Sequence, residues 1–313
     1  MPDPLLNDPT LELVVCNLCG GTEYTLRFPS TRTELSLDGN WQAYCCTYPG
    51  YGIHPPIVAC RNCGLVYTNP RPSREAIKHN YEVVEDPLYL QERVAREITF
   101  RKHLRALERF TGPGRGRRLL DVGAYVGVFV EVACEAGWDA VGLEPSLWAF
   151  NYARERGLTM VRGTLEEADF DPNSFDVFTM WDVIEHLGDP LGEMRRACQI
   201  IRPGGWVAIH TMDLGSLFAR LMGSRWPWLM EMHVYYFTRR TLRELLEKAG
   251  FRVAAIRPEG RYLRLQYLTT RLRPYSASLA DAVDTLGRLT GLDKLPLPVN
   301  FGDLVTAYAQ KPE

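Results

Sequence analysis

The sequence predicts an α/β protein: a mostly parallel sheet covered by helices on both faces, behind a small cysteine-rich N-terminal segment. Three observations predict it. From Arg118 onward, short apolar runs alternate with segments of helical periodicity, which is typical of parallel sheets built from βαβ units. Residues 119–127 read as an apolar strand that ends in a glycine turn before a helix. Two Cys-x-x-Cys pairs precede residue 70.

The chain divides into three parts. Residues 1–70 are rich in Cys, Gly, Pro and Tyr and predict a small module; residues 71–113 read as a helical connector that the glycines at 112–116 end. Residues 114–313 form the large α/β domain, with an insertion at about 259–302. Its seven expected strands are 119–122, 140–143, 159–161, 175–180, 206–211, 251–256 and 304–309. The expected helices are 128–135, 147–156, 190–201 and 242–248. No crossover helix directly precedes the last strand, so we expect it to pair antiparallel, at the edge of the sheet.

Composition narrows the class of protein. The 313 residues carry a formal net charge of −2, with 46% hydrophobic and 24% charged residues. These values are ordinary for a globular protein and argue against a general nucleic-acid binder, so nucleic acid is not an expected partner. No apolar run is long enough to span a bilayer, and the polar, proline-containing start does not resemble a signal peptide. We therefore expect a cytoplasmic protein with reduced thiols.

The glycine turn at 119–127 predicts a nucleotide-type ligand. Gly123 permits a tight turn after the first strand, and Gly127 permits close approach of the helix to the sheet and ligand. Glu144 ends the second strand, 21 positions after Gly123 (144 − 123). A carboxylate there can accept both ribose hydroxyls of an adenosine, a device that NAD enzymes share. An ordinary βα turn is the alternative reading of the glycines alone.

The order of motifs resembles the Rossmann-like fold of class I S-adenosylmethionine-dependent methyltransferases. The matching runs are 120–123, 142–146, 163–166, 175–187 and 201–205. The resemblance implies S-adenosylmethionine as cofactor, and it implies the cofactor-binding residues Asp121, Gly123, Ala124, Tyr125, Gly127, Glu144, Pro145, Gly163, Thr164, Leu165 and Trp181. Tyr125 departs from the family pattern, which often has glycine there, so its side chain either narrows the loop or faces away from it.

The cysteine pairs predict a structural zinc site. Each pair forms a turn with glycine directly after it, and the complete set is Cys16, Cys19, Cys60 and Cys63. Four thiolates would hold Zn²⁺ in a closed tetrahedron; two disulfides or unmetallated thiols are the alternatives. Cys45 and Cys46 are expected to be buried small residues. A zinc-ribbon-like module ahead of such a domain resembles the sugar C-methyltransferases and related enzymes of glycan and natural-product gene clusters, whose module boundary is similar to residues 63–72.

Three regions offer reactive groups. His186 follows the fourth strand of the large domain within an Asp-x-x-Glu-His run, which also resembles metal-dependent quinone O-methyltransferases that hold magnesium. Glu231 and His233 lie two apart, on one face of an extended segment, so the carboxylate can raise the basicity of the imidazole. We expect His233 with Glu231 as general base and His186 as second choice; structural roles are the alternative for each. The arginines of 261–273 could contact an anionic or lipid-linked sugar or a membrane surface, or belong to a packed surface helix.

These features predict methyl transfer from S-adenosylmethionine to a small-molecule acceptor. A sugar or a glycan or natural-product precursor is the first expectation, with nucleotide- or lipid-linked sugars included. A metal-assisted O-methyltransferase of a quinone-like or phenolic substrate is the second. A nicotinamide-dependent enzyme would carry a tighter G-x-G-x-x-G turn, which Tyr125 interrupts. A non-catalytic zinc-ribbon binding protein would not need the complete set of cofactor motifs.

Overall fold

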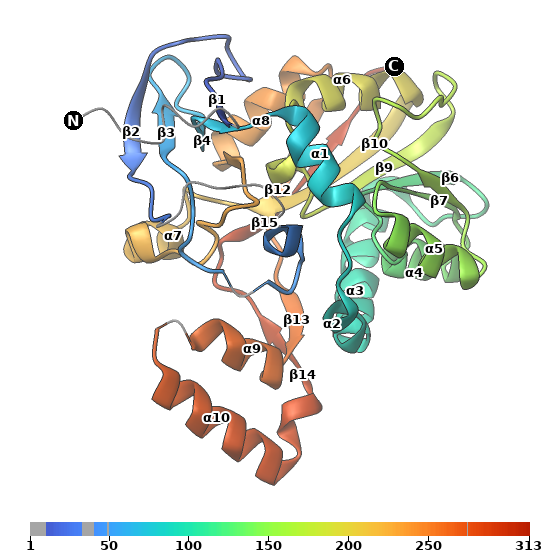
Figure 1. Cartoon of the computed structure of the whole chain (residues 1–313). Coiled ribbons are helices and arrows are strands. Elements are labelled where there is room, and N and C mark those ends of the chain that lie inside the picture. Colours follow the sequence, from blue (N-terminus) through green and yellow to red (C-terminus); the bar gives the residue numbers. More distant parts are fainter. Residues whose placement is uncertain (1–10, 33–40, 49, 274) are drawn as a thin grey trace.

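A seven-stranded sheet forms the centre of the molecule in the computed structural model, which describes residues 11–32, 41–48, 50–273 and 275–313. The strand order is β12-β15-β10-β9-β6-β7-β8 (Figure 1). Their bounds are β6 Arg118–Val122, β7 Asp139–Glu144, β8 Met160–Arg162, β9 Phe175–Trp181, β10 Ile201–Met212, β12 Arg252–Pro258 and β15 Leu304–Gln310. The seven expected strands are therefore confirmed.

The last strand, β15, runs antiparallel to both of its neighbours, β10 and β12. The remaining pairs are parallel. The antiparallel direction is thus confirmed, whereas the expected edge position is wrong, because β15 lies between β10 and β12 and β12 forms the edge. The side chains of the two strands fit these positions. The edge strand β12 exposes Arg252 and Arg257, whereas the inner strand β15 is almost wholly buried.

Helices cover both faces of this sheet, with one large hydrophobic cluster on each face. One hydrophobic cluster joins alternate strand residues such as Leu119 and Val177 to α3 (Arg93–Thr111) and α4 (Val128–Glu135). A second joins Leu120 and Phe178 to α6 (Pro190–Ile200) and α8 (Arg239–Lys248). The helix α5 (Leu147–Glu155) packs on β7 and β8. Since successive strand residues face opposite sides, near-continuous apolar runs are what a doubly covered sheet requires.

The N-terminal part carries its own sheet, and a strand from the large domain completes it. Its order is β11-β4-β3-β2, formed by β2 Tyr24–Phe28, β3 Ile57–Cys60, β4 Val66–Thr68 and β11 Tyr235–Tyr236. Tyr235 pairs with Tyr67 and Tyr236 with Val66, in antiparallel register. A further two-stranded pair joins β1 (Leu11–Glu12) to β5 (Arg71–Pro72), and a short 3₁₀ helix, η2, spans Trp41–Tyr44. The loop after β10 is therefore held against the N-terminal part.

The connector and the insertion supply the remaining elements. The connector contributes α1 (Arg74–Glu82) and α2 (Pro87–Gln91) before α3, and η3 (Ile184–His186) follows β9. The segment after β10 forms α7 (Leu217–Met222) and η4 (Gly223–Arg225). The insertion forms a hairpin of β13 (Arg261–Arg264) and β14 (Pro296–Val299), which encloses α9 (Leu265–Leu272), α10 (Ala277–Thr290) and η5 (Leu292–Lys294). In Figure 1, α9 and α10 extend away from the central sheet. Among the described residues, no helix has the combined length and apolarity needed to cross a membrane.

Candidate active site

A cavity of about 680 Å³ opens at the carboxyl ends of β6, β7 and β9. This is the edge at which parallel α/β sheets bind ligands. Ten of the residues expected to bind a cofactor lie on its wall: Asp121, Gly123, Ala124, Tyr125, Glu144, Pro145, Gly163, Thr164, Leu165 and Trp181. Gly127 is not on the wall; it precedes α4 with φ +76°, where an added Cβ would come within 2.5 Å of Leu158 Cδ1. Its role is therefore helix packing.

Two buried carboxyl groups end neighbouring strands in the wall. The amides of Tyr125 and Ser146 donate to Glu144, one to each carboxylate oxygen, at 2.7 and 2.8 Å. Asp121 accepts from the Thr179 hydroxyl at 2.7 Å. Burial raises the pKa of Glu144 to about 7 and that of Asp121 to about 8. Because each oxygen of Glu144 has a second lone pair, the group can still accept a pair of hydroxyls from a ligand.

Tyr125 lies in the left-handed region of backbone space, with φ 50°. Its ring meets Tyr89 edge-on at 4.5 Å between centroids and lies 5.9 Å from Trp148. The side chain therefore packs in a small aromatic cluster, and the residue also lines the cavity. These contacts account for a non-glycine residue in a conformation that favours glycine.

Several polar atoms of the wall are buried and lack a hydrogen-bond partner in the part of the chain that the structure covers. They are the hydroxyls of Tyr51, Tyr81 and Tyr125, the indole N–H of Trp181, and the Nε–H groups of Arg96 and Arg261. Buried polar groups are ordinarily hydrogen-bonded, so these atoms mark where a polar ligand would be received.

His186 and His233 meet on the same wall, with ring centroids 4.8 Å apart. His186 Nδ1 lies 2.9 Å from the Met232 carbonyl oxygen, and His233 Nδ1 lies 2.7 Å from that of Trp228. Glu185 completes a group of possible metal ligands whose donor atoms lie within 4.8 Å of one another. Burial lowers the pKa of both imidazoles, that of His233 to about 3, and raises that of Glu185 to about 8. Both rings are thus neutral at pH 7, the form that accepts a proton or binds a metal.

Glu231 does not contact His233, contrary to the expected pairing. Its carboxylate binds the Arg32 guanidinium at 3.0 Å, and both side chains are buried. Residues 231 and 232 form a turn rather than extended chain, so the two-residue spacing does not put both side chains on one face. The carboxyl group that lies close to His233 is Glu185. Glu231 instead connects the loop of His233 to the N-terminal part.

Sequence reasoning missed a partly buried ionic network beside the cavity. Asp182, with φ 57°, accepts from Arg261 at 2.9 Å, which joins the end of β9 to the insertion. His210 Nε2 lies 3.7 Å from the same carboxylate, and the ring of His103 lies 4.9 Å from that of His210. Burial alone would raise the pKa of Asp182, but the nearby charge of Arg261 lowers this pKa to about 2. The Asp-x-x-Glu-His run contains Asp182 and could have marked it as a candidate. Its cationic partner, Arg261, lies too far along the chain to be predicted from spacing.

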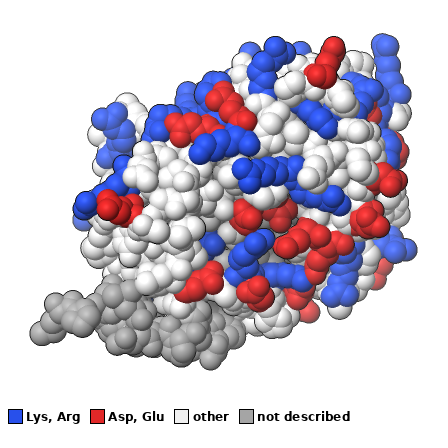
Figure 2. Space-filling view, turned by 90° about the horizontal axis from the view of Figure 1, so that it is seen from above, with Lys and Arg blue, Asp and Glu red and all other residues white. Residues whose placement is uncertain are grey.

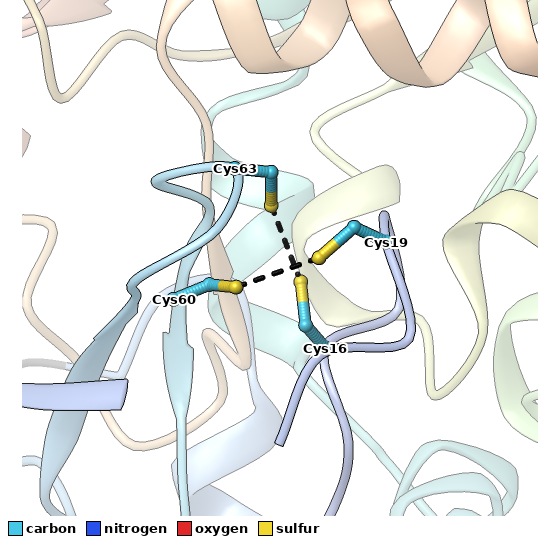
Figure 3. Close-up of side chains that lie close together, drawn as sticks. All are labelled: Cys16, Cys19, Cys60 and Cys63. Atoms are coloured by element: carbon cyan, nitrogen blue, oxygen red, sulfur yellow. Dashed lines mark hydrogen bonds between the residues drawn. The ribbon is translucent and has the colours of Figure 1, made fainter. Parts of the chain in front are cut away.

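The four cysteines of the two pairs come together at a separate place. Figure 3 shows their sulfur atoms pointing toward a common centre. Cys16 Sγ lies 3.4 Å from Cys63 Sγ, and Cys19 Sγ lies 3.5 Å from Cys60 Sγ. Sulfurs at the corners of a zinc tetrahedron would be about 3.8 Å apart, given Zn–S bonds of about 2.3 Å. All eight cysteines are free, so the alternative of two disulfides is not what the structure has.

Both cysteine turns share one backbone pattern. The amides of Cys16 and Cys60 donate to the carbonyls five residues on, and the amides of Gly20 and Gly64 donate back to the cysteine carbonyls. Both glycines have φ near +70°, a conformation that disfavours other residues. The donor set, its spacing and its turns all fit a structural zinc ion. Cys45 is buried as expected, whereas Cys46 is exposed and borders the cavity instead.

Charges on the surface are mixed in sign. On the face in Figure 2, basic and acidic side chains lie interspersed over the large domain. Many of them form surface pairs, such as Lys78 with Glu167 and Arg101 with Glu97. On this face the charges do not gather into the one-sided basic patch typical of nucleic-acid binders.

Known methyltransferases resemble this chain in sequence and in fold. A family model described as a methyltransferase domain matches residues 90–256. Over 105 residues the chain is 36% identical to a ubiquinone biosynthesis O-methyltransferase of Aliivibrio fischeri (strain MJ11), covering 31% of this chain and 45% of that protein. A protein of the same name from Methylococcus capsulatus is 33% identical over 105 residues, covering 31% and 44%. The match thus spans less than half the length of these curated relatives.

Among solved structures, a chain of the complex between the Haloferax volcanii Trm112 methyltransferase activator and a methyltransferase superposes with a TM-score of 0.51. It is 16% identical, and the match covers 70% of this chain and 94% of that one. At this identity the likeness concerns the fold alone.

Proposed function

The chain belongs to the methyltransferase domain family, whose model matches more than half of its length, and we propose that it transfers a methyl group from S-adenosylmethionine to a small-molecule acceptor. The observation that carries this proposal is one continuous cavity. Its wall includes the strand-end carboxyl groups Asp121 and Glu144 and also the histidine pair His186 and His233. A cofactor and an acceptor would therefore meet in one space.

The residues of this chain have distinct proposed tasks. Glu144 accepts the ribose hydroxyls, the turn at Gly123 lets the backbone approach the cofactor, and the loop of Gly163 to Leu165 borders the adenine. When bound, S-adenosylmethionine supplies an already activated methyl group on a sulfonium. The protein then needs only to hold the acceptor in line with it at close range and, for a hydroxyl or acidic carbon, to remove a proton. His233 is our first choice for that base and His186 the second.

We also propose that Cys16, Cys19, Cys60 and Cys63 hold one structural zinc ion. The four sulfurs leave no position for a substrate on a tetrahedral metal, so the ion would stabilise the N-terminal part and take no role in the chemistry. Residues 1–70 then act as a module that contributes to the acceptor side of the cavity through Tyr44, Cys46 and Tyr51. Free thiols throughout are in keeping with a cytoplasmic location, which we propose as well.

Two acceptor classes are proposed. A sugar or glycan precursor, nucleotide- or lipid-linked, follows from the resemblance of the cysteine module to that of sugar C-methyltransferases. The hydroxyl of a quinone-like or phenolic substrate is favoured by a specific observation, the convergence of Glu185, His186 and His233. A divalent metal held there would polarise such a hydroxyl and lower its pKa. The relatives named ubiquinone biosynthesis O-methyltransferase support the second class.

Calorimetry tests the cofactor first. We expect S-adenosylmethionine and S-adenosylhomocysteine to bind with Kd in the micromolar range, about −8 kcal/mol, and NAD to give no heat. Binding of NAD without S-adenosylmethionine would overturn the proposal. Formation of S-adenosylhomocysteine is then followed with phenolic and with sugar acceptors, each with and without added Mg²⁺. Turnover of phenols that rises with Mg²⁺ would select the second acceptor class.

A further inference from the structure

Asn17, inside the first cysteine turn, binds the start of α6. Its Nδ2 donates to Asp189 Oδ1 at 2.7 Å, and its Oδ1 accepts from the Leu191 amide at 2.9 Å. The residue lies between the proposed zinc ligands Cys16 and Cys19, and its two partners follow 172 and 174 residues later in the chain. The turn thus contacts the large domain through a side chain that is not itself a metal ligand.

These two hydrogen bonds complete the cap of α6. The first turn of a helix leaves its amides without partners inside the helix. Asp189 is the N-cap and satisfies one of them, the Gly192 amide, at 2.9 Å. Asn17 satisfies a second, that of Leu191, and it also orients the N-cap carboxylate. Doing both requires a side chain that donates and accepts, as an amide does.

The segment that α6 follows is part of the cavity wall. Residues 182–189, here called the histidine loop, run from the end of β9 to the cap of α6. Glu185, His186, Gly188 and Asp189 of this loop all line the cavity. Glu185 and His186 are also two of the three possible metal ligands described above. Asn17 therefore holds one end of the loop that carries these reactive groups.

A second contact from the N-terminal part acts on the neighbouring residue of the loop. The buried Arg71 donates from Nη2 to the Gly188 carbonyl and from Nη1 to the Tyr235 hydroxyl, both at 2.8 Å. Lys248 of α8 donates to the Leu18 carbonyl at 2.7 Å, which ties the first cysteine turn to another helix of the large domain. Two adjacent residues of the histidine loop are thus bound by side chains that precede residue 72.

We propose that Asn17 is a positioning residue for the active site. Through Asp189 and Leu191 it fixes the place of the histidine loop, and through that loop the place of His186. The cysteine turn gives Asn17 a firm base, because two main-chain hydrogen bonds close residues 16–21 and the sulfurs of the turn meet those of the second turn. The inference rests on the proposed function, since it assigns the loop a part in catalysis, and it gives the cysteine module a part in placing the reacting groups.

Asn17→Ala tests the proposal, with Arg61→Ala as the matched control. Arg61 has the same place in the second cysteine turn, directly after the first cysteine, and its side chain is exposed. Both variants should keep the zinc content of the wild type, because both leave the four cysteines unchanged. With the acceptor that the wild type turns over fastest, Asn17→Ala should lower kcat by about 10- to 100-fold, the effect of slightly misplaced reacting groups. Arg61→Ala should leave kcat unchanged.

Histidine-selective NMR reports on the loop without any turnover. The chain has six histidines, and single substitutions assign their ring signals. The His186 signal should shift or split in Asn17→Ala, while that of the exposed His79 in α1 should not move. An unchanged His186 signal in a folded Asn17→Ala with the zinc content of the wild type would overturn the inference. If the wild type transfers no methyl group but the His186 signal responds, the proposed function fails and the positioning stands.

An exchange of the two side chains tests the contact itself. Asn17→Asp alone would set two carboxylates at hydrogen-bond distance, so it should disturb the His186 signal more than Asn17→Ala does. The double variant Asn17→Asp/Asp189→Asn restores a donor and an acceptor in the opposite sense, so it should recover the His186 signal and most of kcat. A double variant as impaired as Asn17→Asp would contradict the proposal. Circular dichroism establishes folding; should Asn17→Asp not fold, the comparison of Asn17→Ala with Arg61→Ala decides.

Discussion

The imidazole rings of His186 and His233 face each other at 4.8 Å, and each Nδ1 lies against a main-chain carbonyl oxygen. Because a carbonyl only accepts, Nδ1 carries the proton in both rings and both Nε2 atoms keep a free lone pair. The loop of His233 is held in this position from two sides. The amide of Val234 donates to the Glu185 carbonyl, and the amide of Thr68 in β4 donates to the Val234 carbonyl.

His233→Ala should lower turnover by about 10²- to 10⁴-fold, the contribution of a positioned base, and leave the affinity for S-adenosylhomocysteine unchanged. His186→Ala should lower both, since His186 lies in the turn after β9 that borders the cofactor side. Steady-state kinetics on the two variants measures the change in turnover, and calorimetry measures the change in affinity for S-adenosylhomocysteine. Normal turnover in both would mean that proximity alone drives the reaction, as an already nucleophilic acceptor permits.

Cofactor affinity should depend on pH through Glu144. Burial raises the pKa of this carboxyl to about 7, so the group is largely protonated at pH 6 and ionised at pH 8. The ionised form is the stronger acceptor for ribose hydroxyls, so affinity for S-adenosylhomocysteine should rise between these values, by up to about tenfold for a full one-proton dependence. Glu144→Gln should bind more weakly and with a weaker pH dependence, because the pKa of about 8 at Asp121 still leaves a titrating carboxyl group on the wall. A wild-type pH dependence that is equally weak would assign the ribose contact to another residue.

One zinc ion per chain should be found by metal analysis of protein purified without chelator. Cys60→Ser should lower the zinc content sharply, since it removes one of four ligands, while Cys134→Ser, which alters a cysteine outside the four-sulfur group, should leave it unchanged. A thiol count on the unfolded, metal-free chain should find all eight cysteines reduced. Protein free of metal, with cross-linked cysteine pairs, would contradict the site.

The buried pair of Arg32 and Glu231 should stabilise the closed arrangement of the N-terminal part. Removing one member leaves an uncompensated buried charge, so Arg32→Met and Glu231→Leu should each cost about 3–5 kcal/mol in the free energy of unfolding. The double variant should cost less than the sum of the two, because both charges are then gone. Arg273→Met, which breaks the exposed pair with Asp281, should change stability by about 0.5 kcal/mol or less. If urea titration showed that the losses of unfolding free energy in the two single variants add up to the loss in the double variant, the two charges would not interact.

Apolar runs and glycine turns were enough to predict the central sheet, because a strand covered on both faces must be apolar along its whole length. The place of the last strand was mispredicted, although a signal existed. Residues 252–258 carry arginines at positions 252 and 257, which suits an edge, whereas 304–309 carry no charge at all. The chain leaves β12 at the carboxyl edge, forms the insertion, and returns from that same edge, so its last strand must run antiparallel.

The cofactor side of the cavity could be predicted from the sequence because its residues lie at the ends of strands that the apolar pattern predicts. The acceptor side was not, because the contacts of Arg32 with Glu231 and of Arg271 with Cys46 join segments about 200 residues apart. The Glu231–His233 pairing failed for a local reason: period-two alternation applies only to extended chain, and a turn occupies those residues.

The pairing of β11 with β4 means that the N-terminal sheet can be completed only late in synthesis on the ribosome. Tyr67 leaves the exit tunnel early in synthesis, but its partner Tyr235 follows only after the strands β6 to β10 have been made. Until then β4 presents an unpaired edge, which is prone to bind other chains. A zinc ion taken up by the two cysteine turns, all of whose ligands lie before residue 64, would hold the nascent segment in shape during that interval.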